Sequence, residues 1–235
     1  MLSIIIPTLN EEKYLPRLLE SIRRQSFSDY EIIVSDAGST DKTEFVAKEA
    51  GVIFILSNKI KHPSYQRNAG ARVAKGDILL FLDADSQLPE NFLIKAMGEF
   101  KKRNLTGAGF YIKFNPNRFY YNFYSGISNF ICFCKQWGNY PVAVGAGLMS
   151  FKNSHDIISG FDPEVRLAED YDYCYRLSKV GKFRMIKGVR LLYSARRIEK
   201  EGFIVSGLKW LHMGFYTLTH QTIKKDIIKY DFGKF

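Results

Sequence analysis

The stretch ILLFLDADSQLPENF (residues 78–92) opens with an apolar run and then places Asp83 and Asp85 with a single residue between them. An apolar run without polar alternation is typical of a strand that is buried on both faces. Asp at a strand end is also an ordinary turn former. Two carboxylates this close at the end of a buried strand repel each other, however, and a divalent cation is the simplest partner that relieves the repulsion. We therefore favour a metal site.

Other apolar runs repeat this pattern along the chain. LSIIIPTL (2–9), YEIIVSD (30–36), VIFIL (52–56) and DILLFLDAD (77–85) are each followed by a segment with helical periodicity. This alternation predicts an α/β fold with a mostly parallel central sheet flanked by helices. The chain has 235 residues, 46% of them hydrophobic, with no internal repeat or linker, so we expect one domain.

Candidate ligand-binding residues follow the expected strands. In an open parallel sheet, ligands bind beyond the carboxyl ends of the strands. The candidates at these ends are Pro7, Thr8 and Glu11 after the first strand, Asp36 on the second, and Asp83 and Asp85 on the fourth. The glycine patterns of dinucleotide-binding folds and of P-loops are absent, which argues against dehydrogenases and P-loop enzymes.

Charge and cysteine content narrow the partners. A formal net charge of +10 predicts an anionic partner, which leaves nucleic acid, an acidic membrane surface or a phosphorylated small molecule. The basic residues are scattered and no nucleic-acid-binding module is recognisable, so we expect no nucleic-acid partner. Cys132, Cys134 and Cys174 are too few and too poorly spaced for a disulfide framework or a zinc site. The first residues lack a secretory signal, and we expect a cytoplasmic protein.

Several motifs together carry a family resemblance. They are SIIIPTLNEEKYL (3–15), EIIVSDAGSTDKT (31–43), QRNAGARVAKGDILLFLDADS (66–86), GAGLMS (145–150) and AEDYDYCYRLSKVG (168–181). In this order and spacing the chain resembles a family 2 glycosyltransferase of the GT-A fold. The resemblance implies transfer of a sugar from a nucleoside diphosphate donor to a saccharide hydroxyl or a lipid-linked phosphate, by a single displacement with inversion. It also implies a GT-A domain over residues 1–202 and a C-terminal amphipathic helical extension over 203–235.

The resemblance assigns a donor-nucleotide site. Thr8 and Asp36 match positions that hold the base and ribose, and Pro7 and Glu11 lie on the same turn. Arg67 matches an arginine expected to contact the diphosphate or the base, although a surface helix charge is the alternative. The small residues around Arg67 would let its helix lie close to the sheet.

Asp83 and Asp85 match the D-x-D motif of the family. The second Asp of that motif usually binds Mn²⁺ or Mg²⁺, and the first contacts ribose or a metal-bound water. Oxygen ligands suit either ion. The implied role of the cation is to neutralise the departing nucleoside diphosphate.

The resemblance places the general base at Asp170, with Glu169 as the second candidate. Asp170 is expected to open a helix, and a helix N-terminus stabilises a carboxylate and so weakens it as a base. Burial, or repulsion from Glu169 and Asp172, would have to raise its pKa again. We expect Asp172 itself to be solvated or to cap the helix, and glycines of GAGLMS to let the sugar approach the backbone.

Two features stand outside the family motifs. Arg196 and Arg197 follow an expected last strand, where the doublet is either solvated or reaches the donor diphosphate, a role we assign to Arg197. The aromatic segments 119–137 and 203–220 are too short or too interrupted to span a bilayer. They are either core or interfacial elements that contact an anionic membrane from the cytoplasmic side.

Other functions stay open. A non-catalytic nucleotide-sugar-binding or membrane-docking module would use the same donor site, but it should lack the D-x-D or the acidic pair at 169–170, and both are present. A sugar nucleotidyltransferase should begin with a glycine-rich motif, which is absent.

Overall fold

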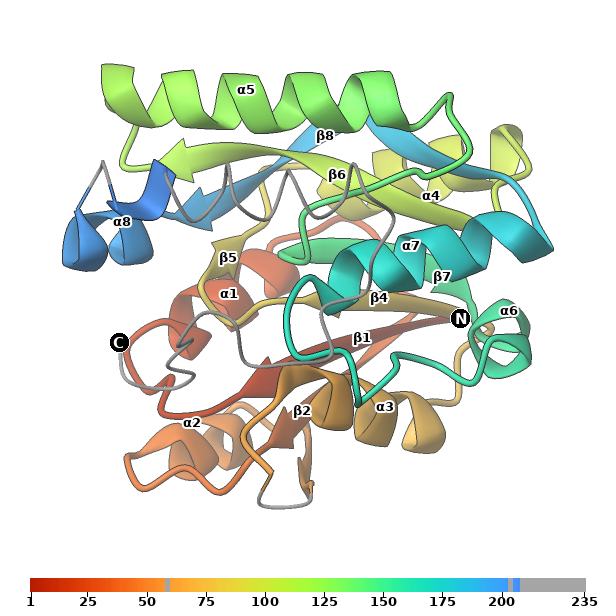
Figure 1. Cartoon of the computed structure of the whole chain (residues 1–235). Coiled ribbons are helices and arrows are strands. Elements are labelled where there is room, and N and C mark those ends of the chain that lie inside the picture. Colours follow the sequence, from red (N-terminus) through yellow and green to blue (C-terminus); the bar gives the residue numbers. More distant parts are fainter. Residues whose placement is uncertain (58–59, 203–204, 208–235) are drawn as a thin grey trace.

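The computed structural model describes residues 1–57, 60–202 and 205–207. One β-sheet forms the centre of this part of the chain (Figure 1). Its strands are β1 (Leu2–Thr8), β2 (Tyr30–Asp36), β3 (Ile53–Leu56), β4 (Ile78–Leu82), β5 (Ser86–Gln87), β6 (Gly107–Asn115), β7 (Gly147–Phe151) and β8 (Phe183–Ser194). The helices are α1 (Leu15–Arg23), α2 (Thr43–Glu49), α3 (Pro63–Val73), α4 (Phe92–Lys102), α5 (Phe119–Lys135), α6 (Lys152–Ile157), α7 (Glu169–Val180) and α8 (Arg196–Glu201).

The strand order is β3-β2-β1-β4-β7-β6-β8-β5. The four strands expected from the sequence, β1 to β4, form a parallel half. Strand β7 runs antiparallel to both β4 and β6, β8 is parallel to β6, and β5 is antiparallel to β8. The α/β class is confirmed, but the whole sheet is mixed. The sequence did not reveal the antiparallel strands, because a strand buried on both faces has the same apolar pattern in either direction.

Strand β1 shows why these runs do not alternate between polar and apolar residues. Ile4 and Ile6 join a core cluster with residues of α1 and α4. Ile5 points to the opposite face and joins a second cluster with residues of α3 and α7. Helices thus cover both faces of the sheet (Figure 1), and successive side chains of the strand pack against opposite helical layers.

The carboxyl ends of the parallel strands meet at one edge. Thr8 at the end of β1 is paired in register with Asp36 at the end of β2. Strand β4 lies on the other side of β1, so the loop that carries Asp83 and Asp85 follows on the same edge. Residues far apart in the sequence are therefore gathered around one opening.

The aromatic segment 119–137 forms the long helix α5, which lies along β6 (Figure 1). One side packs inward through residues such as Tyr121 and Cys132. The other side is exposed, with Phe119 at 89%, Phe123 at 60% and Phe130 at 67% relative exposure. Core packing therefore accounts for only half of this helix.

The predicted C-terminal extension, 203–235, lies outside the described residues except for 205–207. The same holds for the aromatic segment 203–220. Among the described helices, none combines the length and the hydropathy needed to cross a bilayer.

A close contact between α3 and β1 generates the first prediction. A Cβ added at Gly70 would overlap Cγ2 of Ile5, whereas a Cβ at Gly98 in α4 would meet nothing within 4 Å. Overpacking costs ~1–3 kcal/mol, so Gly70→Ala should lower the free energy of unfolding by about that amount. Gly98→Ala should instead raise it by ~0.5–1 kcal/mol, because alanine is the better helix former. Urea unfolding of both variants checks this, and equal stabilities would contradict the packing described here.

Candidate active site

A cleft with a volume of about 850 Å³ opens at this edge of the sheet. Nine of the residues predicted from the sequence line it. They are Pro7, Thr8, Glu11, Arg67, Asp83, Asp85, Glu169, Asp170 and Arg197. The structure thus brings the expected donor, metal and base residues into one space, although they come from opposite ends of the chain.

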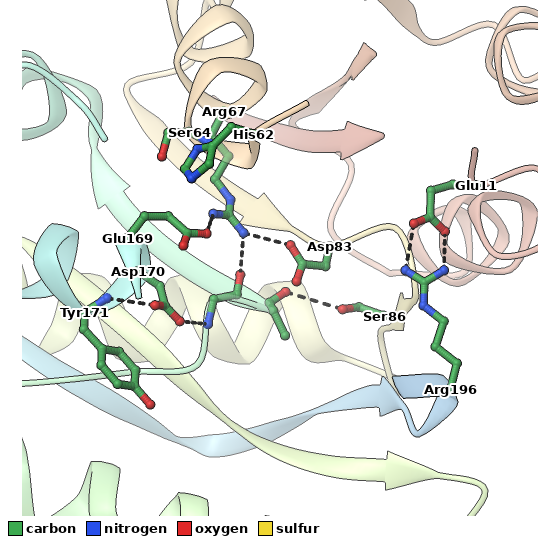
Figure 2. Close-up of polar contacts among 12 residues, drawn as sticks. Glu11, His62, Ser64, Arg67, Asp83, Ser86, Glu169, Asp170, Tyr171 and Arg196 are labelled. Atoms are coloured by element: carbon green, nitrogen blue, oxygen red, sulfur yellow. Dashed lines mark hydrogen bonds and ion pairs between the residues drawn. The ribbon is translucent and has the colours of Figure 1, made fainter. Parts of the chain in front are cut away.

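Arg67 bridges the two acidic groups of the cleft (Figure 2). Nη1 donates to Oε1 of Glu169 and Nη2 donates to Oδ1 of Asp83, both at 2.9 Å. The side chain is only 3% exposed, and its guanidinium also lies over the ring of Phe161 at 5.1 Å. The alternative of a surface helix charge is therefore wrong. Burial opposes the charged form, but Asp83 and Glu169 raise the pKa of Arg67 above its usual value.

Asp170 is held at the start of α7 by backbone N–H groups. Oδ2 accepts a hydrogen bond from the N–H of Gly145 at 2.7 Å, and Oδ1 accepts one from the N–H of Tyr171 at 3.0 Å. The residue is half-buried and lines the cleft.

Burial raises the pKa of Asp170 to about 7, and repulsion from Glu169 adds to this. Arg67 and the two N–H donors act in the opposite direction. The expected conflict between helix N-terminus and base strength is thus present, and burial outweighs it. Asp170 has the proton affinity that a general base needs near neutral pH.

The glycines of GAGLMS were expected to let the sugar approach the backbone, but Gly145 makes room for a protein side chain. A Cβ at this residue would lie 3.0 Å from Oδ2 of Asp170, so the missing side chain makes room for that carboxylate. The neighbouring Gly147 packs against side chains of β6 and β8. Of these two glycines, Gly145 lines the cleft and Gly147 does not.

Glu11, Asp85 and Arg196 form a second charged group. Arg196 binds both carboxylate oxygens of Glu11, at 2.8 and 2.7 Å (Figure 2). Its Nε lies 2.8 Å from Oδ2 of Asp85. Burial raises the pKa of both Glu11 and Asp85, and Arg196 lowers both again. The arginine doublet therefore does reach the cleft, but the described contacts to the carboxylates come from Arg196.

Asp36 does not line the cleft. Its carboxylate accepts hydrogen bonds from the N–H groups of Gly38 and Ser39 and from the hydroxyls of Thr8 and Ser39. The residue is 1% exposed. These hydrogen bonds shape the loop after β2. The Asp36 carboxylate is therefore buried within the protein and does not present an exposed oxygen for the expected direct contact with the donor.

Asp172 was expected to be solvated or to cap the helix, and that is wrong. It is buried, and Oδ2 accepts a hydrogen bond from Nε of Arg176 at 2.7 Å. The i to i+4 spacing of this pair on α7 was visible in the sequence. Asp172 thus stabilises α7 through its pair with Arg176.

Asp83 and Asp85 are the residues that a divalent cation would use. The described residues contain no cluster of three or more His, Cys, Asp or Glu side chains that could hold a metal on their own. Mg²⁺ and similar ions are commonly bound through one or two carboxylates together with phosphate oxygens and water. The two carboxylates fit as a partial ligand set that a nucleoside diphosphate completes.

Sequence reasoning missed the central place of Arg196. Its position at the carboxyl end of the last strand was a signal, but its partner Glu11 lies near the other end of the chain. His62 was missed as well. It is 3% exposed, caps α3 through Ser64, and burial lowers its pKa.

The bridge made by Arg67 can be tested by its removal. Deleting one partner of a buried ion pair costs ~3–5 kcal/mol, because the remaining charges lose their compensation. We expect Arg67→Ala to lower the free energy of unfolding by this amount in urea titrations. Arg72→Ala, an exposed arginine on the same helix, should change it by less than ~0.5 kcal/mol. Equal unfolding midpoints for the two variants would mean that Arg67 compensates nothing.

Comparisons with solved structures agree with this fold. The mannosyltransferase PcManGT from Pyrobaculum calidifontis, in complex with GDP-Man and Mn²⁺, has a TM-score of 0.68 at 19% identity, over 81% of this chain and 56% of that one. S. aureus TarS 1-349 in complex with UDP-GlcNAc has a TM-score of 0.65 at 20% identity, over 82% of this chain and 58% of that one. The chain has the GT-A fold of these glycosyltransferases.

Sequence comparison identifies the family. The chain is 31% identical over 201 residues to the dolichyl N-acetyl-alpha-D-glucosaminyl phosphate 3-beta-D-2,3-diacetamido-2,3-dideoxy-beta-D-glucuronosyltransferase of Methanococcus voltae, which covers 77% of this chain and 62% of that protein. Across the curated relatives compared, the chain spans between 28% and 62% of their length. Residues 3–157 match the family model described as glycosyl transferase family 2. The chain therefore belongs to glycosyl transferase family 2.

Proposed function

We propose that the chain transfers a sugar from a nucleoside diphosphate donor to an acceptor hydroxyl or a lipid-linked phosphate, by a single displacement with inversion. The observation that carries the proposal is the position of Arg67 between Asp83 on one side of the cleft and Glu169, next to Asp170, on the other. The residues assigned to catalysis and donor binding lie within residues 1–202, the proposed GT-A domain.

The donor diphosphate binds beside Asp83 and Asp85. A divalent cation, Mn²⁺ or Mg²⁺, supplies neutralisation of the leaving diphosphate when it is held by these carboxylates. Pro7, Thr8 and Glu11 line the adjoining part of the cleft for the nucleotide, and Arg197 lies on the same side. Neighbouring folds support this use of the cleft, because TarS was crystallised with UDP-GlcNAc and PcManGT with GDP-Man and Mn²⁺.

Asp170 acts as the general base. It accepts the proton of the acceptor hydroxyl while that oxygen forms a bond to the anomeric carbon and the bond to the diphosphate breaks, so the electron pair leaves with the diphosphate. A lipid-linked phosphate that is already ionised needs no proton removed. Attack and departure occur on opposite faces of the sugar, which inverts the anomeric configuration. Glu169 is held by Arg67 and orients the segment that carries Asp170.

The exposed side of α5 contacts an anionic bilayer. Apolar side chains along this side, such as Phe123 and Phe130, are 60% and 67% exposed. Arg118 lies exposed just before the helix, and Arg184 lies over the ring of Trp137 just after it. Aromatic side chains flanked by basic residues suit the headgroup region of anionic lipids. The same helix lines the cleft through Phe123 and Phe130, so a lipid-linked acceptor would arrive beside the base.

The role of Asp170 predicts both a rate and a pH profile. Removing a positioned base costs ~10²–10⁴ in rate, so Asp170→Asn should lose that much kcat for a hydroxyl acceptor while donor affinity survives. The base works only when deprotonated, and its pKa is raised to about 7. The wild-type rate should therefore fall as the pH drops below about 7 and level off above it. An unperturbed aspartate would give a flat profile down to about pH 5.

Glu169→Gln is the matched control for this experiment. It should lower kcat less than Asp170→Asn does, and its rate should still depend on pH, with a midpoint at lower pH because repulsion from Glu169 no longer raises the pKa of Asp170. A collapse of turnover in Glu169→Gln with near-normal turnover in Asp170→Asn would move the base to Glu169. Donor binding without turnover for any acceptor would instead favour a non-catalytic nucleotide-sugar-binding module.

Membrane contact can be tested by liposome flotation at low salt. The wild-type protein should float with anionic liposomes, and the double variant Phe123→Glu/Phe130→Glu should bind at least ~10-fold more weakly, because two charges enter the contact face. The double variant Phe45→Glu/Ile94→Glu alters equally exposed residues on α2 and α4 and should bind like the wild type. Absence of binding to anionic liposomes would contradict the proposed membrane contact. A molecular mass in solution above that of one chain would indicate that the exposed side of α5 contacts a second copy of the chain instead.

A further inference from the structure

One guanidinium joins three separate parts of the cleft. Arg196 at the start of α8 binds Glu11 from the loop after β1 and Asp85 from the loop after β4. The Cζ atom also lies 4.5 Å from the centre of the Tyr14 ring. These contacts leave the side chain 16% exposed.

Arg196 is the ion-pair partner that the structure gives Asp85. The Asp85 side chain is 5% exposed, and a buried carboxylate without a partner carries a large desolvation cost. Nε of Arg196 lies 2.8 Å from Oδ2 of Asp85 and supplies the compensating positive charge.

Asp85 is also the carboxylate that the proposed function assigns to a divalent cation, and the inference rests on that function. Nε of Arg196 already lies 2.8 Å from Oδ2 of Asp85. A cation on the same carboxylate would lie within a few ångströms of the guanidinium, where two positive charges repel strongly in a partly buried site. The guanidinium and the cation therefore compete for Asp85.

We propose that Arg196 is an internal counter-ion of Asp85 that a divalent cation displaces, and that the displaced guanidinium then binds the diphosphate of the donor. The contacts suit such an exchange. Arg196 contacts Asp85 through Nε and binds Glu11 through the two hydrogen bonds of its Nη atoms, so it can release Asp85 and keep Glu11. Its planar fork matches phosphate oxygens well.

Arg196 belongs to α8, which also contacts α5. This helix spans only Arg196–Glu201, and Glu199 within it accepts a hydrogen bond from the hydroxyl of Tyr121 in α5 at 2.8 Å. Helix α8 thus carries both the arginine that contacts Asp85 and a direct contact to α5.

The test is calorimetric titration with Mn²⁺ alone, at pH 8 and without nucleotide. Arg196→Ala should bind Mn²⁺ ~10–100-fold more tightly than the wild type, because a charge-assisted hydrogen bond to Asp85 no longer competes. Arg196→Lys keeps the positive charge but loses the fork, and it should bind Mn²⁺ ~3–10-fold more tightly. Arg190→Ala removes the same charge from an exposed position on β8 and should change the affinity less than ~2-fold.

A second titration separates competition from a general charge effect. At saturating Mn²⁺, both variants at position 196 should bind a nucleoside diphosphate at least ~10-fold more weakly than the wild type, because the diphosphate loses its arginine partner. Thermal unfolding checks that each variant is folded, and Arg196→Lys carries the test if Arg196→Ala is not.

Two outcomes would overturn the inference. They are an unchanged or weaker Mn²⁺ affinity in a folded variant at position 196, and the absence of measurable Mn²⁺ binding in both the wild type and these variants. Neither depends on turnover. If the wild type transfers sugar with Mn²⁺ while the variants bind Mn²⁺ no more tightly, the proposed function stands and this inference fails.

Discussion

Acidic side chains crowd into one partly buried cleft, and the need to compensate their charge constrains the rest of the site. Glu11, Asp83, Asp85, Glu169 and Asp170 all line it. Two arginines meet this need. Arg67 binds Asp83 and Glu169, and Arg196 binds Glu11 and Asp85. Asp170 has no ion pair among the described contacts; backbone N–H groups hold it, and burial raises its pKa to about 7. In the proposed function, the carboxylates paired with arginine serve binding and Asp170 accepts the proton.

The fold explains why these groups meet. The parallel strands β1, β2 and β4 end at the same edge, so their loops are neighbours in space. Arg67 can reach the cleft because α3 lies close on β1 at Gly70. Arg196 directly follows β8, which pairs with β6. Strand β7 lies between β6 and the parallel half of the sheet, and α5 lies along β6. In the proposed function, α5 would contact the membrane and would bring a lipid-linked acceptor to the cleft, where Arg67 and Arg196 compensate the carboxylates.

Much of this could be predicted from the sequence. The strands β1 to β4 and the residues at their ends follow from local patterns, and so does the start of α7 at the acidic pair. The partners of Arg67, Arg196 and Asp36 could not be predicted in this way. The contact of Glu11 with Arg196 joins residues 185 positions apart, and no local pattern encodes it. Asp36 shows the opposite limit, because a strand-end carboxylate can bind a ligand or fold its own loop, and only the hydrogen bonds to Thr8, Gly38 and Ser39 distinguish the two.

The central claim is that this cleft binds a nucleoside diphosphate sugar through carboxylates that a divalent cation bridges. The most direct measurement is calorimetric titration of the wild-type protein with a panel of nucleoside diphosphate sugars, each with and without Mn²⁺. The account predicts that at least one donor binds with Mn²⁺ and that its affinity falls at least ~10-fold when the cation is removed, because the diphosphate then faces Asp83 and Asp85 without a bridging charge. Equal affinity with and without Mn²⁺, or no binding of any donor in its presence, would contradict it.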